Sequence, residues 1–515
     1  MQLCNTAAVN LADLVRAAAE RTPAKAALLQ ADEQLSWAEL DAGVSRVAEG
    51  LRRLGLVTGD RVALMLGNTP AFAQCYFGIL RAGLVAVPVN TAYTPRELEH
   101  VLGDSGARAV VTAATAAAGL AELRTALPGL EHVVVAEGSR VPPGTVALDA
   151  VVAGGSGGPV ASTGGGEDLA LLIYTSGTSG RPKGAMLSHR ALLANLDQVR
   201  DIEPPVCTAD DVVLLVLPLF HIYGLNSGLG LVARYGATGV LVERFDPVET
   251  LGEVRRCGVT NVIGAPPMYV AWSMLPDLGA AFAAVRLMVS GAAPLPAAVL
   301  ERLLDITGQY VFEGYGLTET APVLTSTLMS EVAKPASIGR PIPGVELRLR
   351  DEQGGPVEEG DPGEIVVRGT NLFSGYWPDG SDGPDGEGWF ATGDVAYADD
   401  DGDLHLVDRR KELILVSGFN VYPREVEDVL VAHPDVAEAA VLGVTHPYTG
   451  EAVKALVVLR QGAGLTSDEV LEHCARQLAR FKCPTVVEFV DELPHTATGK
   501  VSKGRLREHL ATGLA

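Results

Sequence analysis

An apolar run that enters a glycine-rich loop near residue 175 limits the fold of this chain more than any other feature. The run is Asp168-Leu-Ala-Leu-Leu-Ile-Tyr174, and Thr-Ser-Gly-Thr-Ser-Gly follows it directly. A continuous apolar run of this kind predicts a strand that is buried on both faces of a sheet. Helix and strand signals alternate along the rest of the chain, which predicts the α/β class. Because 515 residues exceed the size of one ordinary core, we expect two or more compact units.

Local patterns predict further elements on both sides of this junction. Apolar runs predict strands at Arg61–Leu66 and Val85–Val89, and the segment 153–166, rich in Gly and Ser, predicts a flexible surface loop. A charged cluster, Asp408-Arg-Arg-Lys411, follows an acidic, glycine-rich stretch at 376–403, and the pattern restarts after it. The elements predicted there are strands at 413–416, 437–444, 454–459 and 486–490, a helix at 424–432 with Pro423 in its first turn, and a helix from the capping box of Thr466 and Glu469 to about Arg480. We therefore expect the C-terminal residues to form a small α+β domain.

The charge and the cysteines narrow the choice of partners and compartment. A net charge of −23 argues against nucleic acid or an anionic membrane as the main partner, because both require a basic surface. Six cysteines are scattered without a Cys-x-x-Cys pair, which argues against a zinc site and a disulfide framework. The N-terminus lacks a basic signal-peptide region, and no uncharged apolar run reaches the roughly 20 residues of a membrane span. We expect a cytoplasmic protein with no integral membrane segment, and a homodimer is left open.

The loop after the apolar run carries the strongest chemical signal. Tyr174-Thr-Ser-Gly-Thr-Ser-Gly-Arg-Pro-Lys183-Gly184 combines glycines and hydroxyl residues with one lysine, which suits a loop that wraps phosphate oxygens. The alternative is a polar hairpin turn between two strands. The string lacks the Gly-Lys-Ser/Thr ending of a P-loop, so a P-loop nucleotidase is disfavoured. The candidate phosphate-binding residues are Thr175, Ser176, Gly177, Thr178, Ser179, Gly180 and Lys183.

This string resembles the phosphate-loop signature of the adenylate-forming superfamily of acyl-CoA synthetases, adenylation domains and luciferases. Further strings resemble motifs of the same family in the same order, over essentially the whole chain. They are Leu217-Pro-Leu-Phe-His221-Ile-Tyr-Gly224, Ser290-Gly-Ala-Ala-Pro294, Gly314-Tyr-Gly-Leu-Thr-Glu319-Thr320, Thr392-Gly-Asp394, Asp408-Arg409-Arg-Lys411 and Thr498-Gly-Lys500. Among the members, the chain looks closest to fatty acid–CoA ligases. The resemblance implies a large N-terminal domain of mixed sheets flanked by helices (1–408), a hinge (409–411) and a small mobile α+β C-terminal domain (412–515) that carries the catalytic lysine.

Several of these motifs predict a nucleotide and magnesium site. Tyr315 lies between Gly314 and Gly316, which suits stacking on adenine, although a core tyrosine beside a turn is the alternative. Glu319 can hold Mg²⁺ together with Thr175, since Mg²⁺ takes few protein ligands, and a solvated glutamate is the alternative. The remaining nucleotide candidates are Thr318 beside the magnesium site, Asp394 for the ribose hydroxyls, Arg409 near ribose or phosphate, and Lys411.

The resemblance also implies residues for the acid, for CoA and for catalysis. His221 lies by the carboxylate of the bound acid, although a lone histidine in an apolar segment is more often a core residue. Gly291, Ala292 and Thr320 are the other candidates on the acyl side, and Gly418 is the candidate for CoA. Lys500, in a glycine-containing loop, is predicted to offset the charge that develops on the α-phosphate. The family usually has a basic residue at the position of His495, and this departure weakens a phosphate role there.

Together these motifs imply a ligase with two half-reactions. A small-molecule carboxylic acid attacks the α-phosphate of ATP, while Mg²⁺ and the phosphate loop neutralise the leaving pyrophosphate and Lys500 stabilises the transition state. The small domain then rotates about Lys411, and the thiol of coenzyme A attacks the acyl-AMP.

The substrate class follows from what the acyl-side segments lack. The segments 218–231, 264–273 and 311–325 contain no Lys or Arg, so a second carboxylate would be buried unpaired. Phe220-His221 also lacks the aspartate that amino-acid adenylation domains place after the phenylalanine. We expect a medium- or long-chain fatty acid. The alternatives are an aryl acid of the coumarate or benzoate type, and an acyl-AMP ligase that loads a carrier protein. Those carrier-loading enzymes have an inserted segment before the small domain, and 395–410 shows none.

Overall fold

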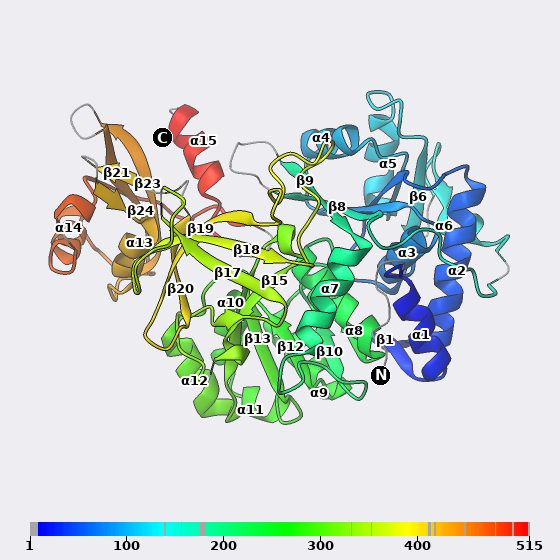
Figure 1. Ribbon diagram of the computed structural model, residues 1–515, viewed down its shortest axis with the longest axis horizontal. Coiled ribbons are helices and arrows are strands. Elements are labelled where there is room, and N and C mark those ends of the chain that lie inside the picture. Colours follow the sequence, from blue (N-terminus) through cyan, green and yellow to red (C-terminus); the bar gives the residue numbers. More distant parts are fainter. Residues whose placement is uncertain are drawn as a thin grey trace. The chain divides into compact units, whose positions relative to one another are not determined.

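The computed structural model describes residues 9–138, 141–155, 157–175, 182–330, 332–351, 353–409, 412, 414–416, 419–446, 450–478, 480–496 and 499–512. These residues form an α/β protein of mixed sheets and helices, which confirms the predicted fold class (Figure 1). The chain divides into two compact units. The first is Met1–Glu346 with Arg368–Phe390, and the second is Leu347–Val367 with Ala391–Ala515. Among the described residues, no helix combines the length and apolarity that crossing a membrane requires.

The apolar run before the glycine-rich loop lies in a seven-stranded sheet of the first unit. In spatial order its strands are β7 (Val146–Ala147), β6 (His132–Glu137), β5 (Ala109–Ala113), β3 (Arg61–Met65), β4 (Val85–Pro88), β8 (Leu169–Thr175) and β9 (Lys183–Ser188). All neighbours are parallel except β8 and β9, which pair antiparallel. The predicted strands at 61–66, 85–89 and 168–174 are thus confirmed. Leu172 of β8 is fully buried in a core with Val110 and Val133, as expected for a strand that is covered on both faces.

Six helices precede β8 in the described part of the chain (blue to cyan in Figure 1). They are α1 (Asp13–Arg21), α2 (Trp37–Arg53), α3 (Pro70–Arg81), α4 (Pro95–Ser105), α5 (Ala114–Leu123) and α6 (Leu148–Val152). Helices α3 to α6 pack against the seven-stranded sheet, while α2 packs on α3 and α1 packs on α2. Helix α2 begins at a capping box in which Ser36 accepts from the backbone of Glu39. It approaches α3 closely, since a side chain at Gly78 would lie 2.5 Å from Cγ1 of Val47. A glycine is therefore required at this crossing.

A nine-stranded sheet forms the rest of the first unit. In spatial order its strands are β16 (Arg340–Pro341), β15 (Val323–Ser326), β14 (Val311–Gly316), β13 (Leu287–Gly291), β12 (Asn261–Gly264), β10 (Val212–Leu215), β11 (Thr238–Leu241), β1 (Ala26–Gln30) and β2 (Glu33–Ser36). In this spatial order, the neighbouring strands between β14 and β1 are all parallel. The pairs at the two edges, β16 with β15, β15 with β14 and β1 with β2, are antiparallel. The connecting helices are α7 (His189–Arg200), the π-helix η2 (Tyr223–Gly230), α8 (Leu231–Tyr235), α9 (Pro247–Cys257), α10 (Pro266–Ser273), α11 (Leu278–Ala281), α12 (Ala297–Thr307) and the 3₁₀ turns η3 (Thr318–Thr320) and η4 (Thr327–Met329). Ligands of α/β sheets bind beyond the carboxyl ends of such parallel strands.

The second unit contains two smaller sheets. The first has the order β17 (Val345–Arg350), β18 (Gly363–Gly369), β19 (Phe390–Ala398) and β20 (Leu404–Arg409), and the outermost residues of β17, β18 and β19 belong to the first unit. The second has the order β22 (Phe419–Val421), β21 (Ile414–Val416), β24 (Gly450–Leu459) and β23 (Val436–His446), with β25 (Val486–Phe489) parallel to β24. The helices are α13 (Pro423–Val431), α14 (Ser467–Ala475), the 3₁₀ turn η5 (Arg480–Lys482) and α15 (Lys503–Thr512). Val426, Val441 and Val457 lie in its core.

The elements predicted for the C-terminal part are confirmed with one exception. Thr466 caps α14 through the predicted capping box, but the helix ends at Ala475 and not near Arg480. The N–H groups of Gln477 and Leu478 both donate to the carbonyl of Cys474, so the chain leaves the helix through a turn that contains no Gly or Pro. Phe481 packs against the core beyond this turn. Of the predicted hinge, Arg409 ends β20, and 410 and 411 lie outside the described residues. The boundaries 1–408, 409–411 and 412–515 stay predictions.

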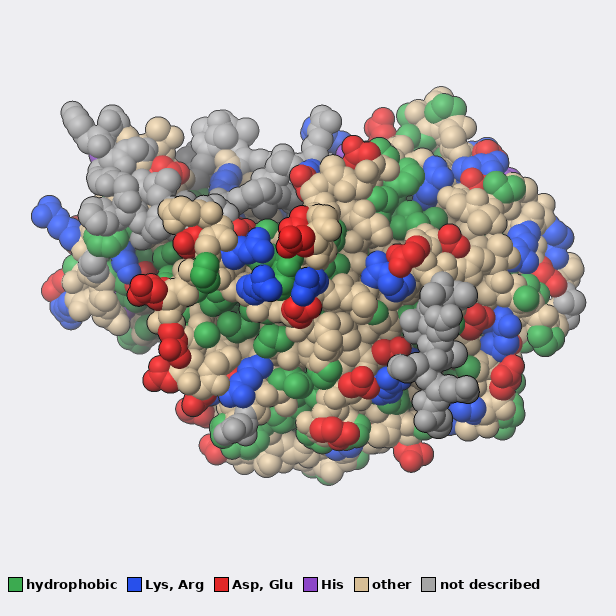
Figure 2. Space-filling model, in the orientation of Figure 1, with side chains coloured by type: hydrophobic (Ala, Val, Ile, Leu, Met, Phe, Trp, Pro, Cys, Tyr) green, Lys and Arg blue, Asp and Glu red, His purple; other side chains and the backbone are tan. Residues whose placement is uncertain are grey.

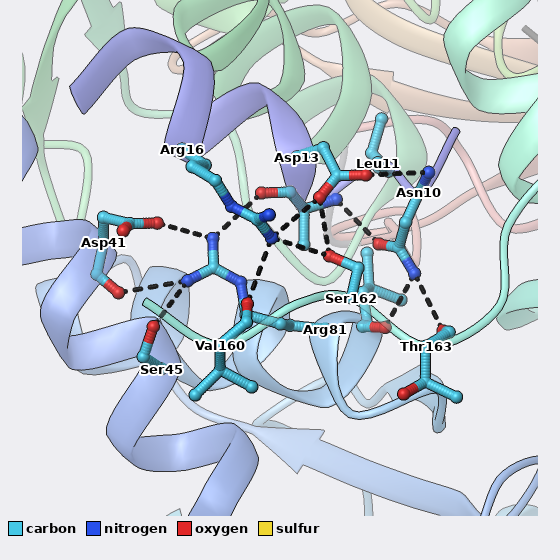
Figure 3. Close-up of polar contacts among 12 residues, drawn as sticks. Asn10, Leu11, Asp13, Arg16, Asp41, Ser45, Arg81, Val160, Ser162 and Thr163 are labelled. Atoms are coloured by element: carbon cyan, nitrogen blue, oxygen red, sulfur yellow. Dashed lines mark hydrogen bonds and ion pairs between the residues drawn. The ribbon is translucent and has the colours of Figure 1, made fainter. Parts of the chain in front are cut away.

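The glycine- and serine-rich segment 153–166 has no strand in its second half but is tied to its neighbours (Figure 3). Arg16 of α1 donates to the carbonyl of Val160 at 3.1 Å, and Asn10 donates to the carbonyl of Thr163 at 3.3 Å. Thr163 in turn donates its backbone N–H to the carbonyl of Arg81, at the end of α3. The prediction of a surface loop is correct, but these hydrogen bonds anchor its described second half to α1 and α3.

Candidate active site

The base of the predicted phosphate loop is an antiparallel pair of strands. Thr175 at the end of β8 lies opposite Lys183 at the start of β9. The loop that joins them, with the predicted residues Ser176, Gly177, Thr178, Ser179 and Gly180, lies outside the described residues. The hairpin alternative therefore describes the strands correctly, and it does not conflict with a phosphate-binding loop at their ends. On the face in Figure 2, basic side chains are interspersed with acidic ones, so an anionic ligand there depends on local cations. Lys183, at the start of β9, is the cation at the base of the predicted phosphate loop.

Lys183 has two neighbours that the sequence did not suggest. Its Nζ lies 2.8 Å from Oδ2 of Asp382 and 5.2 Å from the ring centroid of Tyr376. Both partners belong to a segment that the sequence shows only as part of an acidic, glycine-rich stretch. The available signal was the aromatic pair Tyr376-Trp377 inside that stretch. Because the ion pair with Asp382 is exposed, it costs little to exchange it for a phosphate.

Glu319 is buried and held at one oxygen. Only 9% of its surface is exposed, so the alternative of a solvated glutamate is wrong. Its Oε1 accepts a hydrogen bond of 2.5 Å from the hydroxyl of Tyr376, and its backbone carbonyl accepts from the N–H of Phe373. Within the described residues, no group donates to Oε2. A carboxylate with one bonded and one unbonded oxygen fits the oxygen ligands that Mg²⁺ prefers.

The strands beside Glu319 bring nucleotide and acyl candidates to one edge of the nine-stranded sheet. Gly314 of β14 and Gly291 of β13 are directly paired at the carboxyl ends of parallel strands. A side chain at Gly291 would lie 2.9 Å from the ring of Tyr223 in η2. His221, just before η2, accepts at Nδ1 from the backbone of Tyr223. The structure thus brings His221, Gly291 and Gly314 close together, and their roles in acid and nucleotide binding stay predictions.

Four other candidate residues on this edge of the sheet are buried or half-buried in the fold. Tyr315 is 9% exposed, the burial expected of a core tyrosine, so its stacking on adenine stays a prediction. Thr320 is fully buried, and its hydroxyl donates to the carbonyl of Pro322 and accepts from the N–H of Leu317, which stabilises the η3 turn. Thr318 opens the same turn and is half-buried. Ala292 follows β13 with a φ of 73°, a conformation that L-residues rarely adopt.

The two glycines around Tyr315 respond differently to substitution. A methyl group at Gly316 would overlap the backbone carbonyl of Pro322, whereas one at Gly314 would lie 3.5 Å from the nearest described atom, the carbonyl oxygen of Thr325. We expect Gly316→Ala to lower the free energy of unfolding by about 1–3 kcal/mol, the cost of overpacking, and Gly314→Ala to leave it unchanged. Thermal unfolding of the two variants checks this. Equal midpoints would contradict the close approach at Gly316.

The remaining candidates lie in the second unit and are described within it alone. Asp394 of β19 lies opposite Arg409 of β20, and Asp394 is 7% exposed. The carbonyl of Lys500 accepts from the N–H of Thr496 at 2.7 Å. Nε2 of His495 lies 3.4 Å from Oε1 of Glu438, in line with the weak case for a phosphate role there. Lys411 and Gly418 lie outside the described residues.

Comparison with known proteins identifies the family. Residues 15–377 match the model of the AMP-binding enzyme family, and residues 425–500 match that of its C-terminal domain. The chain is 38% identical to a long-chain-fatty-acid–CoA ligase of Yersinia pestis (97% of this chain, 94% of the relative) and 39% identical to a feruloyl-CoA synthase of Amycolatopsis sp (95% and 96%).

Solved structures agree over the same span. The ATP-bound MatB of Rhodopseudomonas palustris superposes with a TM-score of 0.89 at 36% identity (97% of this chain, 99% of that chain). The anthranilate CoA ligase AuaEII, in complex with anthranoyl-AMP, gives 0.89 at 29% identity (99% of each chain). The predicted membership of the adenylate-forming superfamily, close to fatty acid–CoA ligases, is therefore confirmed. The chain belongs to the AMP-binding enzyme family and is an AMP-forming acid–thiol ligase.

Proposed function

We propose that this chain is an acyl-CoA ligase for an apolar monocarboxylic acid, a medium- or long-chain fatty acid. It converts the acid and ATP to acyl-AMP and pyrophosphate and then transfers the acyl group to CoA, with ATP, Mg²⁺ and CoA as its cofactors. One observation supports this choice of substrate class. The segments 218–231, 264–273 and 311–325 border the carboxyl ends of β10, β12 and β14 and contain no Lys or Arg. A second carboxylate on the substrate would be buried there without a cation.

The adenylation half-reaction is assigned to the residues that the motifs predicted. Lys183 supplies a cation for the phosphates, and Glu319 and Thr175 supply oxygen ligands for Mg²⁺. Mg²⁺, when bound, offsets the charge of the leaving pyrophosphate. Asp394 accepts hydrogen bonds from the ribose, and Lys500 stabilises the charge that develops on the α-phosphate. Because these roles need no proton transfer from the protein, positioning and charge account for the catalysis.

The connection between β19 and β20 supports CoA as the acyl acceptor. The two strands are joined by a tight turn in which Asp399 donates its N–H to the carbonyl of Asp403 at 2.9 Å. This turn leaves no room for the inserted segment that marks ligases loading a carrier protein. Transfer to CoA is therefore favoured over transfer to a carrier. The homodimer and the cytoplasmic location stay predictions.

An aryl acid is the second candidate substrate, and one observation favours it. The hydroxyls of Tyr223 and Ser290 are buried and have no hydrogen-bond partner among the described residues. Burial raises the pKa of Tyr223 above its ordinary value, so its hydroxyl stays a neutral donor. A polar substituent on an aromatic acid would satisfy these groups, whereas an alkyl chain would not.

Steady-state kinetics across a panel of acids decide between these substrates. If the acid is aliphatic, kcat/KM should rise roughly three- to fourfold per added CH₂ until the pocket is full, because each buried CH₂ contributes about 0.8 kcal/mol. Malonate should be far poorer than any fatty acid, because its second carboxylate is unpaired. AMP formation with CoA supplied or withheld identifies the acceptor. Faster turnover of malonate than of every fatty and aryl acid would contradict the assignment of the pocket.

A further inference from the structure

The segment 373–382 joins the base of the phosphate loop to Glu319. It runs beside β9 as an added strand, with the N–H of Ser374 donating to Met186 at 2.9 Å and that of Trp377 donating to Gly184 at 2.8 Å. The N–H of Met186 in turn donates to the carbonyl of Gly375, which completes the pairing of the segment with β9. Its position relative to Lys183, the first residue of β9, is therefore determined by backbone hydrogen bonds.

The other end of the segment is attached to η3. The N–H of Phe373 donates to the carbonyl of Glu319 at 2.9 Å, and just before it the side chain of Asn371 donates to the carbonyl of Thr320 at 2.7 Å. Asn371 is fully buried. The segment also turns tightly, since Gly375 has a φ of 91° and a methyl group there would overlap the carbonyl of Gly380. These constraints hold the backbone of Tyr376 between two candidate ligand groups.

The side chain of Tyr376 contacts both groups. Its ring packs edge-on against Phe373 with centroids 5.1 Å apart, and the ammonium of Lys183 lies 5.2 Å above its face. Its hydroxyl donates to Oε1 of Glu319 at 2.5 Å, the short distance of a hydrogen bond to a charged oxygen. The terminal torsion of a glutamate is soft, so without this bond the carboxylate would rotate.

We propose that Tyr376 is a positioning residue for adenylation. Its hydroxyl orients the carboxylate of Glu319 so that Oε2 faces the metal ion, and its ring orients the ammonium of Lys183. The proposal rests on the role of Glu319 as a magnesium ligand in the proposed function. Groups that hydrogen-bond a metal ligand typically change metal affinity by about 10–100-fold when they are removed.

The variant Tyr376→Phe keeps the ring and removes only the hydroxyl. We expect the Mg²⁺ concentration for half-maximal ATP binding, measured by calorimetry without the acid so that no turnover occurs, to rise about 10–100-fold. Binding of adenosine without Mg²⁺ should stay at the wild-type value, even though the loss of a hydrogen bond to a buried carboxylate lowers the thermal midpoint. High Mg²⁺ should restore kcat. Tyr310→Phe, a tyrosine that is 54% exposed, is the matched control and should change none of these quantities.

Two results would overturn the proposal, and a third variant separates it from the proposed function. A wild-type Mg²⁺ dependence in Tyr376→Phe would show that the hydroxyl does not orient Glu319. A fall in thermal midpoint with equal losses of adenosine and ATP binding would assign Tyr376 to folding alone. Glu319→Gln must itself shift the Mg²⁺ dependence. If it does not, the assignment of Glu319 fails, whereas a shift in Glu319→Gln without one in Tyr376→Phe rejects only the role of Tyr376.

Discussion

Replacing Lys500 with Ala is expected to abolish acyl-adenylate formation while ATP binding and the transfer of preformed acyl-AMP to CoA stay largely intact. Lys500 is exposed, its N–H donates to the hydroxyl of Thr496, and the preceding Gly499 has a φ of 82°. The hydrogen bonds between residues 496 and 500 define the backbone position from which the side chain of Lys500 extends. Removing a preorganised charge of this kind typically costs roughly 10²-fold or more in rate.

Pyrophosphate exchange measures the adenylation step, and thioester formation from synthetic acyl-AMP measures the second step separately. The control is His495→Gln, which changes a neighbouring side chain of the same loop that is paired with Glu438. It should retain nearly wild-type exchange. An exchange rate of Lys500→Ala within a few-fold of wild type would reject the catalytic role. Equal losses in both variants would attribute the effect to the loop and not to the ammonium.

The sequence predicted the elements whose signals are local. Capping at Thr466, proline at the start of the helix after Tyr422, and the buried run 169–174 depend on neighbours within a few residues, and the structure confirms them. The predicted end of α14 near Arg480 was wrong, because the helix ends at Ala475. Phe481 beyond it packs against a core with Val426 and Val441, which are distant in the sequence. Local pattern carries no information on such contacts.

In the candidate site, too, the sequence predicted individual residues but not the tertiary contacts between them. Glu319 and Lys183 were predicted from motifs, but their link through Tyr376 was not, because 57 residues separate the hydroxyl donor from its acceptor. The ion pair of Lys183 with Asp382 spans 199 residues. Both contacts depend on how the segment 373–382 pairs with β9, and that register is a tertiary property. The burial of Glu319 has the same origin.

A second substitution with a large expected effect, on the free energy of unfolding, is in the buried hydrogen-bond network of Figure 3. Arg81 at the end of α3 is fully buried, with its guanidinium 2.6 Å from Asp41 and 2.9 Å from the hydroxyl of Ser45. Burial lowers the pKa of Arg81, and Asp41 opposes this shift. Arg81→Met should lower the free energy of unfolding by about 3–5 kcal/mol, because it leaves the carboxylate of Asp41 without its cation. All four tryptophans lie in the first unit, so urea unfolding followed by tryptophan fluorescence reports on the unit that contains the network.

Two further variants distinguish the contribution of a buried ion pair from that of a surface ion pair. Arg256→Met removes an exposed partner of Glu253 and should cost at most about 1 kcal/mol. The double variant Arg81→Met with Asp41→Leu replaces the whole pair with apolar groups and should recover much of the loss, since the unpaired charge is then absent. If Arg81→Met cost no more than Arg256→Met, the pair would be solvated in solution. If the double variant were less stable than Arg81→Met, the loss would come from the packing of α2 against α3 and not from an uncompensated carboxylate.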